Sequence, residues 1–302
     1  MKRGCVILCL FLVSGLVSCV GHNRYSLIVP GGSPQLALMY VDEDPDYLVD
    51  IVQGADALVA AFGSKSHDFI VAPTNLGAKL YQTKPDYILI AAIVFGNYYL
   101  VTQTDSVFDL DTLNGREITV FGMNQTSEII LTYILSSHDI VSDYRIVDSV
   151  QTAMADFVFD PSRVVLVAEP SLSILSAQFP EISVIDLQVA YQELTGESSY
   201  PQAGAFARAT LTQDEISDFL DLLETSVNQV LNSPETAADT AASLNYPYSR
   251  DVLLSAIPNS HLGFVSALDV REDLEAYFSL ILERNPALIG GGLPDHAFYY
   301  LP

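Results

Sequence analysis

The amino-acid sequence predicts an α/β fold in which mostly parallel sheets are flanked by helices. Short apolar strands alternate with helical patterns along the chain, and a polar or glycine-containing turn follows most of these strands. The chain has 302 residues, of which 50% are hydrophobic, which is enough for one large core or two ordinary ones. This composition excludes an intrinsically disordered chain.

The first half of the chain repeats a pattern of strand, turn and helix. Runs of apolar residues predict buried strands over residues 26–29, 69–72, 87–94 and 98–102. The turn Pro-Gly-Gly-Ser-Pro follows the first strand, and Thr74 or Asn75 is placed to cap a helix after the second. Gly96 and Asn97 separate the third run from the fourth.

The second half repeats the pattern and then becomes helical. Strands are predicted over residues 118–121, 164–168, 182–185 and 203–207. Gly122 ends the first of these, and the chain enters a helix through Asn124, Thr126 and Ser127. A long helix is expected over residues 212–231, with Thr212 or the run Gln213-Asp214-Glu215 at its acidic start, and the pattern stays helical to residue 279.

The amino terminus has the layout of a bacterial lipoprotein signal. Lys2 and Arg3 precede an apolar stretch that is too short to span a membrane stably, and residues 16–19 read Leu-Val-Ser-Cys. This resembles the lipobox, whose Cys takes a diacylglycerol. We therefore expect residues 1–18 to be a signal peptide, Cys19 to carry the lipid and fatty acids such as palmitate, and residues 19–25 to be a tether. The alternative is an ordinary signal peptide with a chance cysteine.

Cysteine content and charge narrow the possible partners. Cys5 and Cys9 would leave with the signal peptide, so the exported domain would have no thiol for a disulfide or a Cys metal site. The chain has 13 Lys and Arg against 37 Asp and Glu, a formal net charge of −24. Such a charge repels phosphate backbones, so nucleic acid is excluded as a partner.

Five short motifs, taken in order, carry a resemblance to a known family. They are PGGSP at 30–34, DTLNGREI at 111–118, AEP at 168–170, YPQ at 200–202 and IGGGLP at 289–294. In this order they resemble the extracytoplasmic solute-binding proteins of ABC importers. The match is to the two-lobed periplasmic binding protein type 2 fold, in the group that binds thiamine-precursor pyrimidines, alkanesulfonates or nitrate. Each motif alone is weak, but together they cover nearly the whole mature chain.

The resemblance implies a two-lobed architecture with a hinge. Residues 26–115 with 204–302 would form a discontinuous first lobe, and residues 116–203 the second, with crossings near 111–116 and 200–205. It further implies closure of the lobes around a ligand, delivery to an ABC permease with its ATPase, and a monomer anchored outside the cytoplasm to the bacterial cell membrane.

The candidate ligand-binding residues lie where strands end, because ligands of open α/β sheets bind beyond the carboxyl ends of the strands. The set is Gly32, Ser33, Thr74, Asn75, Asn97, Tyr98, Gln125, Thr126, Ser127 and Glu169. Alternatively, Thr74 and Ser127 cap helices, Asn97 turns the chain and Glu169 is a solvated helix cap. Tyr98 and Tyr99 are adjacent on one strand, so at most one of them can face the ligand.

The scarcity of basic residues bears on the class of ligand. Only Lys79 and Arg116 lie within a few residues of a predicted cleft segment. This favours a neutral or cationic heterocycle, such as a thiamine-precursor pyrimidine, over a sulfonate or nitrate held by helix N-termini.

Other function classes have less support in the sequence. It contains no G-x-S-x-G, P-loop, G-x-G-x-x-G or HExxH motif, and its five His are scattered, so we expect no catalytic residues, metal or cofactor. An enzyme on the same scaffold, of the menaquinone-pathway dehydratase type, and a purely structural surface lipoprotein stay open as alternatives.

Overall fold

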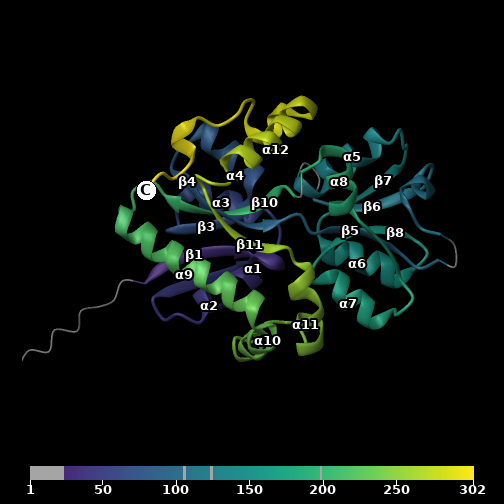
Figure 1. The fold of residues 1–302 in the computed structure, drawn as a ribbon, viewed down its shortest axis with the longest axis horizontal. Helices are drawn as coiled ribbons and strands as arrows, with labels where there is room; N and C mark the ends of the chain where they lie inside the picture. Colours follow the sequence, from purple (N-terminus) through teal and green to yellow (C-terminus); the bar gives the residue numbers. More distant parts are fainter. Residues whose placement is uncertain (1–23, 105–106, 123–124, 198) are drawn as a thin grey trace, which may run out of the picture.

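The computed structural model describes residues 24–104, 107–122, 125–197 and 199–302. These residues form two lobes, each built on one sheet with helices on both faces (Figure 1). The predicted α/β class is confirmed. The expected signal peptide and Cys19 lie outside the described residues. Among the helices that are described, none is long and apolar enough to cross a membrane.

The first lobe contains a six-stranded sheet in the order β11-β4-β10-β3-β1-β2. Its strands are β1 (Tyr25–Pro30), β2 (Tyr47–Val52), β3 (Phe69–Pro73), β4 (Tyr87–Phe95), β10 (Pro201–Arg208) and β11 (Leu262–Ser266). Its α-helices are α1 (Ser33–Ala37), α2 (Met39–Asp42), α3 (Asp56–Ser64), α4 (Thr74–Thr83), α9 (Gln213–Asn232), α10 (Pro234–Ser243), α11 (Arg250–Asn259) and α12 (Arg271–Arg284). Short 3₁₀ turns, η2 (Pro286–Ile289) and η3 (His296–Phe298), follow α12. β1 pairs in parallel with β2 and β3, whereas β10 and β11 run antiparallel to their neighbours.

The second lobe contains a five-stranded sheet in the order β7-β6-β8-β5-β9. Its strands are β5 (Tyr98–Thr102), β6 (Glu117–Phe121), β7 (Asp143–Val147), β8 (Val164–Ala168) and β9 (Ser183–Asp186). Its helices are the 3₁₀ turn η1 (Leu110–Leu113), α5 (Thr126–Ser137), α6 (Val150–Phe159), α7 (Ser171–Gln178) and α8 (Leu187–Thr195). Only β5 runs against its neighbours in this sheet.

The chain crosses between the lobes twice. Both crossings lie at other residues than the expected lobe boundaries. The boundary after residue 115 is wrong, because β5 already pairs with β8 and β9 of the second sheet. The first crossing is therefore at Gly96 and Asn97, where Gly96 has a φ of 52°. The return to the first lobe is complete at Pro201, where β10 begins, and not at residue 204. An apolar run predicts a strand, but it does not show which sheet the strand joins.

Three strands were not predicted from the sequence, and all three lie at the edges of their sheets. β2 and β11 flank the first sheet and β7 flanks the second. Their residues are half-buried or exposed over most of their length, so they lack the continuous apolar runs that mark central strands. β11 also corrects the expectation of unbroken helix up to residue 279.

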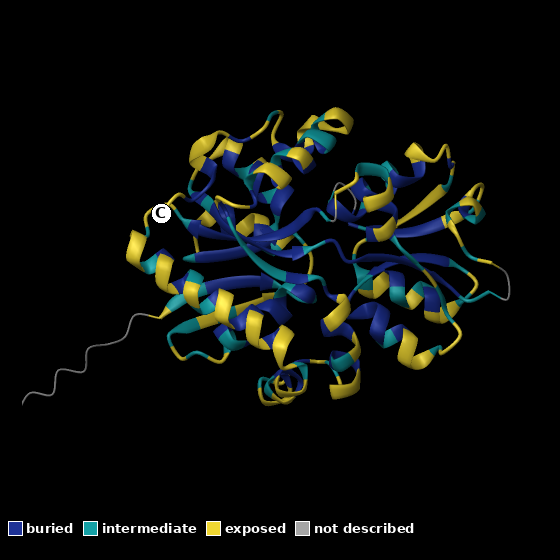
Figure 2. Cartoon of the chain, in the orientation of Figure 1, coloured by how far each residue is buried: buried dark blue, intermediate teal, exposed yellow. Residues whose placement is uncertain are grey.

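The core of the first lobe lies between its sheet and the covering helices, and the buried residues follow the strands in both lobes (Figure 2). Phe219 of α9 stacks on Phe69 of β3, with ring centroids 3.9 Å apart and an interplanar angle of 17°. The predicted start of α9 is confirmed: Thr212 accepts a hydrogen bond from the Glu215 backbone N–H, and the Glu215 carboxylate accepts one from the Thr212 backbone N–H. This capping box fixes the helix that covers the sheet.

Candidate functional site: the interlobe cleft

A cavity of about 390 Å³ lies between the lobes, where strands end and helices begin. The first lobe lines it with residues 30–34, 53–55, 97, 202 and 247–248, and the second with residues 98, 121, 125, 148–151 and 168–171. Its volume is in the range of pockets that hold small organic molecules. The site therefore has the position expected for an open α/β sheet, beyond the carboxyl ends of the strands.

Six of the predicted site residues line this cavity. They are Gly32, Ser33, Asn97, Tyr98, Gln125 and Glu169. The other four, Thr74, Asn75, Thr126 and Ser127, are not among the residues that line it. That the six contact a ligand stays a prediction. The expectation that the other four face the cavity is wrong, because their side chains form hydrogen bonds inside the protein.

Thr74 and Asn75 are turned into the protein interior. The Thr74 hydroxyl donates to the Pro201 carbonyl at 2.7 Å, and the Asn75 amide donates to the Leu288 carbonyl at 3.4 Å. Neither residue caps α4, because its N-cap is Pro73 and both lie within the helix. Thr74 thus connects α4 to the segment that returns from the second lobe. Its hydroxyl donates its hydrogen bond within the protein, although Thr74 was expected to contact the ligand.

Thr126 and Ser127 serve the packing of α5. The Thr126 hydroxyl donates to the Asn75 side-chain oxygen at 3.2 Å, which joins the two lobes away from the cavity. The Ser127 hydroxyl donates to the Phe121 carbonyl at 2.8 Å. Both hydroxyls are buried, so their hydrogen bonds offset the cost of removing them from water.

A polar network around Asn97 forms one wall of the cavity. The Asn97 amide donates to the Ser33 hydroxyl at 2.6 Å, and its backbone N–H donates to the Gln202 side-chain oxygen at 3.1 Å. The Ser33 hydroxyl in turn donates to the Glu169 carbonyl at 3.2 Å, across the boundary between the lobes. Asn97 and Ser33 are both buried, so the network holds the crossing segment in a fixed orientation.

Glu169 places a buried carboxyl group at the cavity wall. Its side chain is buried, with 3% of the residue exposed, which rules out a solvated helix cap. The two carboxylate oxygens accept hydrogen bonds from the Ser173 backbone N–H at 3.1 Å and from the Ser173 hydroxyl at 3.0 Å. Burial nevertheless raises the pKa of Glu169 to about 7, because desolvation outweighs these hydrogen bonds. The peptide bond between Glu169 and Pro170 is cis.

Tyr98 is the tyrosine of the adjacent pair that faces the cavity. Its ring meets Phe121 edge-on, with the centroids 6.0 Å apart. Tyr99 points to the opposite face of β5, into an apolar cluster with Phe157, and its hydroxyl donates to the Asn259 carbonyl at 2.9 Å. Burial raises the pKa of Tyr98, so it presents a neutral phenol and an aromatic ring.

Among the described residues that line the cavity there is no Lys or Arg, whereas two acidic side chains, Asp148 and Glu169, are present. Lys79 is exposed on α4, and the Arg116 guanidinium donates to the Ser162 carbonyl at 3.1 Å, so neither of the two nearby bases lines the cavity. Besides serine and tyrosine hydroxyls, the described lining includes five side-chain amides: Gln53, Asn97, Gln125, Gln151 and Gln202. Amides both donate and accept hydrogen bonds, so they suit a polar ligand that offers both acceptors and donors.

Sequence reasoning missed Gln53 and Gln151, which meet at the mouth of the cavity. The Gln151 amide of α6 donates to the Gln53 side-chain oxygen at 3.2 Å, from the second lobe to the first. Both side chains are exposed. No motif marks either residue, because Gln53 follows the unpredicted strand β2 and Gln151 lies at the start of α6.

Within the described part of the chain, no group of three or more His, Cys, Asp or Glu could hold a metal ion.

Comparisons with known proteins place this geometry in a structural class. No protein-family model matches the sequence, and no curated protein matches it. Among solved structures, the chain is similar to an ABC transporter from Parabacteroides distasonis, at 18% identity and a TM-score of 0.80, over 92% of this chain and 99% of the other.

Two further solved structures show the same similarity. The periplasmic aliphatic sulphonate binding protein of Escherichia coli matches at 12% identity and a TM-score of 0.71, over 93% of this chain and 92% of the other. The ligand binding component of an ABC-type import system from Staphylococcus aureus matches at 14% identity and a TM-score of 0.69, over 93% and 97%. The chain therefore has the two-lobed periplasmic binding protein type 2 fold, as its motifs predicted.

Proposed function

We propose that this chain is the solute-binding protein of an ABC import system. It captures a small organic molecule between its lobes and delivers it to a permease with its ATPase. The observation that carries the proposal is the cavity at the two crossing segments, lined by both lobes. The similar structures support it, since two of them are described as an ABC transporter and as a ligand-binding component of an ABC-type import system.

The ligand is a neutral or cationic heterocycle, such as a thiamine-precursor pyrimidine. The lining offers the aromatic rings of Tyr98 and Phe121 for ring contact and five amides for hydrogen bonds. Asp148, and Glu169 in its ionised form, would attract a cation and repel an anion, and the described lining residues include no base to offset them. Binding between two lobes also requires groups on both sides, which the amides supply.

A sulfonate or nitrate is the second candidate. The N-terminus of α6 lines the cavity through Ser149, Val150 and Gln151, and a helix N-terminus attracts anions. One similar structure is an aliphatic sulphonate binding protein. However, Asp148 immediately precedes the N-cap Ser149 of this helix, and its negative charge would repel a second anion at the positive end of the helix dipole, which favours the first candidate.

An enzyme of the menaquinone-pathway dehydratase type is less well supported. Of the lining residues that the structure describes, the titratable ones are Asp148, Glu169, Tyr98 and Tyr248, and none is Cys, His or Lys. These side chains can bind a ligand by hydrogen bonds, ring contact and charge without any covalent chemistry. The protein acts outside the cytoplasm, anchored through lipid on Cys19, and this part of the proposal rests on the lipobox in the sequence. That it acts as a monomer rests on the resemblance to solute-binding proteins.

A thermal-shift experiment tests the ligand class. The thiamine-precursor pyrimidine should raise the midpoint of unfolding, and at 100 times the dissociation constant the stabilisation is about 2.7 kcal/mol. Tyr98→Ala should weaken this stabilisation, whereas Tyr98→Phe, which keeps the ring, should retain most of it. Stabilisation by alkanesulfonate or nitrate alone, unchanged in Tyr98→Ala, would show that the charge argument is wrong.

A further inference from the structure

Helix α6 of the second lobe presents apolar side chains to the ligand cleft as well as to the core. Ala153 and Phe157 are buried in the core of the lobe. Val150 and Met154, which lie one turn apart on another face of the helix, line the cavity. Both are half-buried, because they pack against the core on one side and line the cavity on the other.

Helix α7 repeats this arrangement. Leu172 and Leu175 belong to the same core as Phe157 of α6, whereas Ile174 lies between them in sequence and lines the cavity. Ile174 is half-buried, and α7 contacts α6. We call Val150, Met154 and Ile174 the apolar wall of the cleft.

The polar groups of the cleft are concentrated on other segments. Ser33, Asn97 and Gln202 are joined by the hydrogen bonds described above, and the Ser33 hydroxyl continues the network to the Glu169 carbonyl. These residues belong to the crossing segments and to the ends of β1 and β8. The cleft therefore has a polar region at the crossing segments and an apolar wall on α6 and α7.

A ligand that consists only of a polar ring leaves the apolar wall in contact with water. Removing apolar surface from water is favourable, so the wall stabilises a ligand that places apolar atoms against it. The cavity, at about 390 Å³, is in the range of pockets that hold drug-sized ligands, so it has room for a group beyond the ring.

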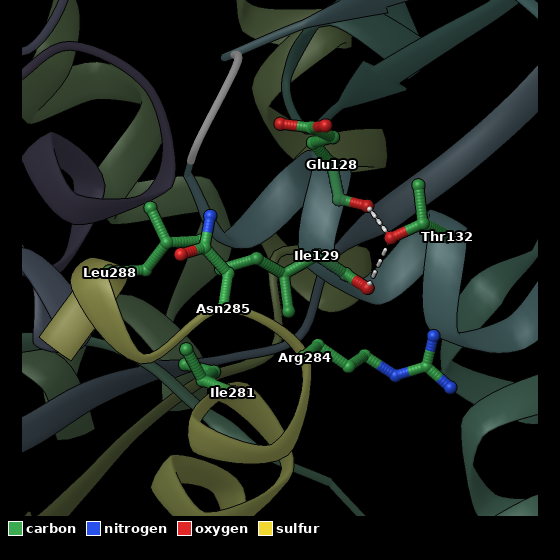
Figure 3. A pocket seen from close by; sticks show the side chains of 7 residues that line it. All are labelled: Glu128, Ile129, Thr132, Ile281, Arg284, Asn285 and Leu288. Carbon is green, nitrogen blue, oxygen red and sulfur yellow. Dashed lines mark hydrogen bonds between the residues drawn. The ribbon is translucent and has the colours of Figure 1, made fainter. Parts of the chain in front are cut away.

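A smaller cavity in the described structure is less suited to this group. It lies between α5 and α12, has a volume of about 170 Å³ and shares no lining residue with the cleft (Figure 3). Glu128 and Arg284 are part of its lining, and the Thr132 hydroxyl donates to the Glu128 and Ile129 carbonyls of its own helix at 2.8 and 3.1 Å. Pockets that hold small molecules begin at about 300 Å³, so the cleft is the better place for an apolar group of the ligand.

We propose that the ligand carries an apolar arm in addition to its polar ring, and that Val150, Met154 and Ile174 bind this arm. The ligand class is then a heterocycle with an alkyl substituent. The ring contacts the polar region at the crossing segments, and the arm extends along α6 and α7. The assignment of the ring rests on the proposed function, whereas the apolar wall is a property of this chain's own side chains.

A series of ligands that differ only in the length of the arm tests the proposal. Calorimetric titration of the full chain would compare 4-amino-2,5-dimethylpyrimidine with the corresponding 5-ethyl, 5-propyl and 5-butyl compounds. Each methylene that becomes buried against the wall should tighten binding about fourfold. Dissociation constants that stay the same along the series would overturn the proposal.

Met154→Gln tests the wall itself, because glutamine has a similar length and places a polar amide where the thioether was. The gain for each methylene should be lost, while binding of the 5-methyl compound should change little. Val158→Gln is the matched control, since Val158 lies one turn further along α6, is 49% exposed and is not among the residues that line the cavity. It should keep the fourfold gain, and a gain that persists equally in Met154→Gln would refute the role of the wall.

Methyl resonances of labelled methionine give a second measurement on the wild type, which does not depend on how well Met154→Gln folds. The chain has four methionines, and the signal that disappears in Met154→Leu identifies Met154. The 5-butyl compound should shift this signal more than the 5-methyl compound does. Met39, which is fully buried in α2, should not shift. A Met154 signal that ignores the length of the arm would overturn the proposal.

The ring and the arm fail in different ways. If the pyrimidines do not bind but alkanesulfonates bind more tightly with each methylene, the ring assignment is wrong and the apolar wall stands. If the pyrimidines bind regardless of arm length and the Met154 signal does not respond, the proposed function stands and the apolar arm is refuted. Binding of neither series would overturn both.

Discussion

Glu169→Gln should stabilise the ligand-free protein at neutral and alkaline pH. The wild-type carboxyl group is buried and has a pKa of about 7, against 4.5 for an ordinary glutamate. At 1.36 kcal/mol for each pKa unit, keeping Glu169 ionised in the folded protein costs at most about 3 kcal/mol. Glutamine carries no charge, and its amide can still bond to the backbone N–H and hydroxyl of Ser173.

The sign of the effect follows from the raised pKa. Below pH 4.5 the carboxyl group is protonated in the folded and the unfolded chain, so it does not affect stability. Between pH 4.5 and about 7 the unfolded chain releases the proton first, and the wild type loses stability progressively. Above about pH 7 the loss is complete. The advantage of Glu169→Gln should therefore be small at pH 4.5 and largest near pH 8.

Urea unfolding at pH 4.5 and pH 8 measures this difference. Glu181→Gln, which removes an exposed carboxylate from the same lobe, is the matched control and should show little change. An advantage of Glu169→Gln that is equal at the two pH values would refute the reasoning, as would a loss of stability at pH 8. A destabilising carboxylate in a cleft is typical of a functional group, and this result would support its assignment to ligand binding.

Two further predictions concern the amino terminus and the hinge. Cys19→Ala should leave the chain unprocessed by the lipoprotein peptidase and unlabelled by radioactive palmitate, whereas normal labelling would end the lipoprotein assignment. Gly96→Ala should lower the free energy of unfolding by about 2 kcal/mol or more, because a Cβ there would lie 1.8 Å from the Gln188 side-chain oxygen and 2.9 Å from the Tyr200 ring. Gly63→Ala adds a Cβ in open space and is the control in urea unfolding, and equal stabilities of the two variants would contradict the prediction.

The central strands could be predicted from the sequence because they are buried on both faces. Runs such as residues 69–72 and 164–168 are continuously apolar, and each became a strand within one residue of its expected bounds. The sheet to which β5 belongs could not be predicted, since its residues are as apolar as those of β4. The chain enters the other lobe at a single turn at Gly96. The lobe to which β5 belongs is known only from its pairing with β8.

The site was predictable where it depends on the backbone and not where it depends on side-chain direction. Ser33, Asn97 and Glu169 line the cavity because they follow strands whose carboxyl ends meet there. Thr74 also follows a strand, but its hydroxyl turns inward to the Pro201 carbonyl. The partner of Thr74 is distant in sequence, so nothing local to it shows that the hydroxyl is already used.

Scattering on addition of ligand tests most directly the central claim that the lobes close around a neutral or cationic heterocycle. Saturating thiamine-precursor pyrimidine should reduce the radius of gyration of the wild type, and an alkanesulfonate at the same concentration should leave it unchanged. A profile that does not change with the pyrimidine, or that becomes more compact only with a sulfonate or nitrate, would contradict the account.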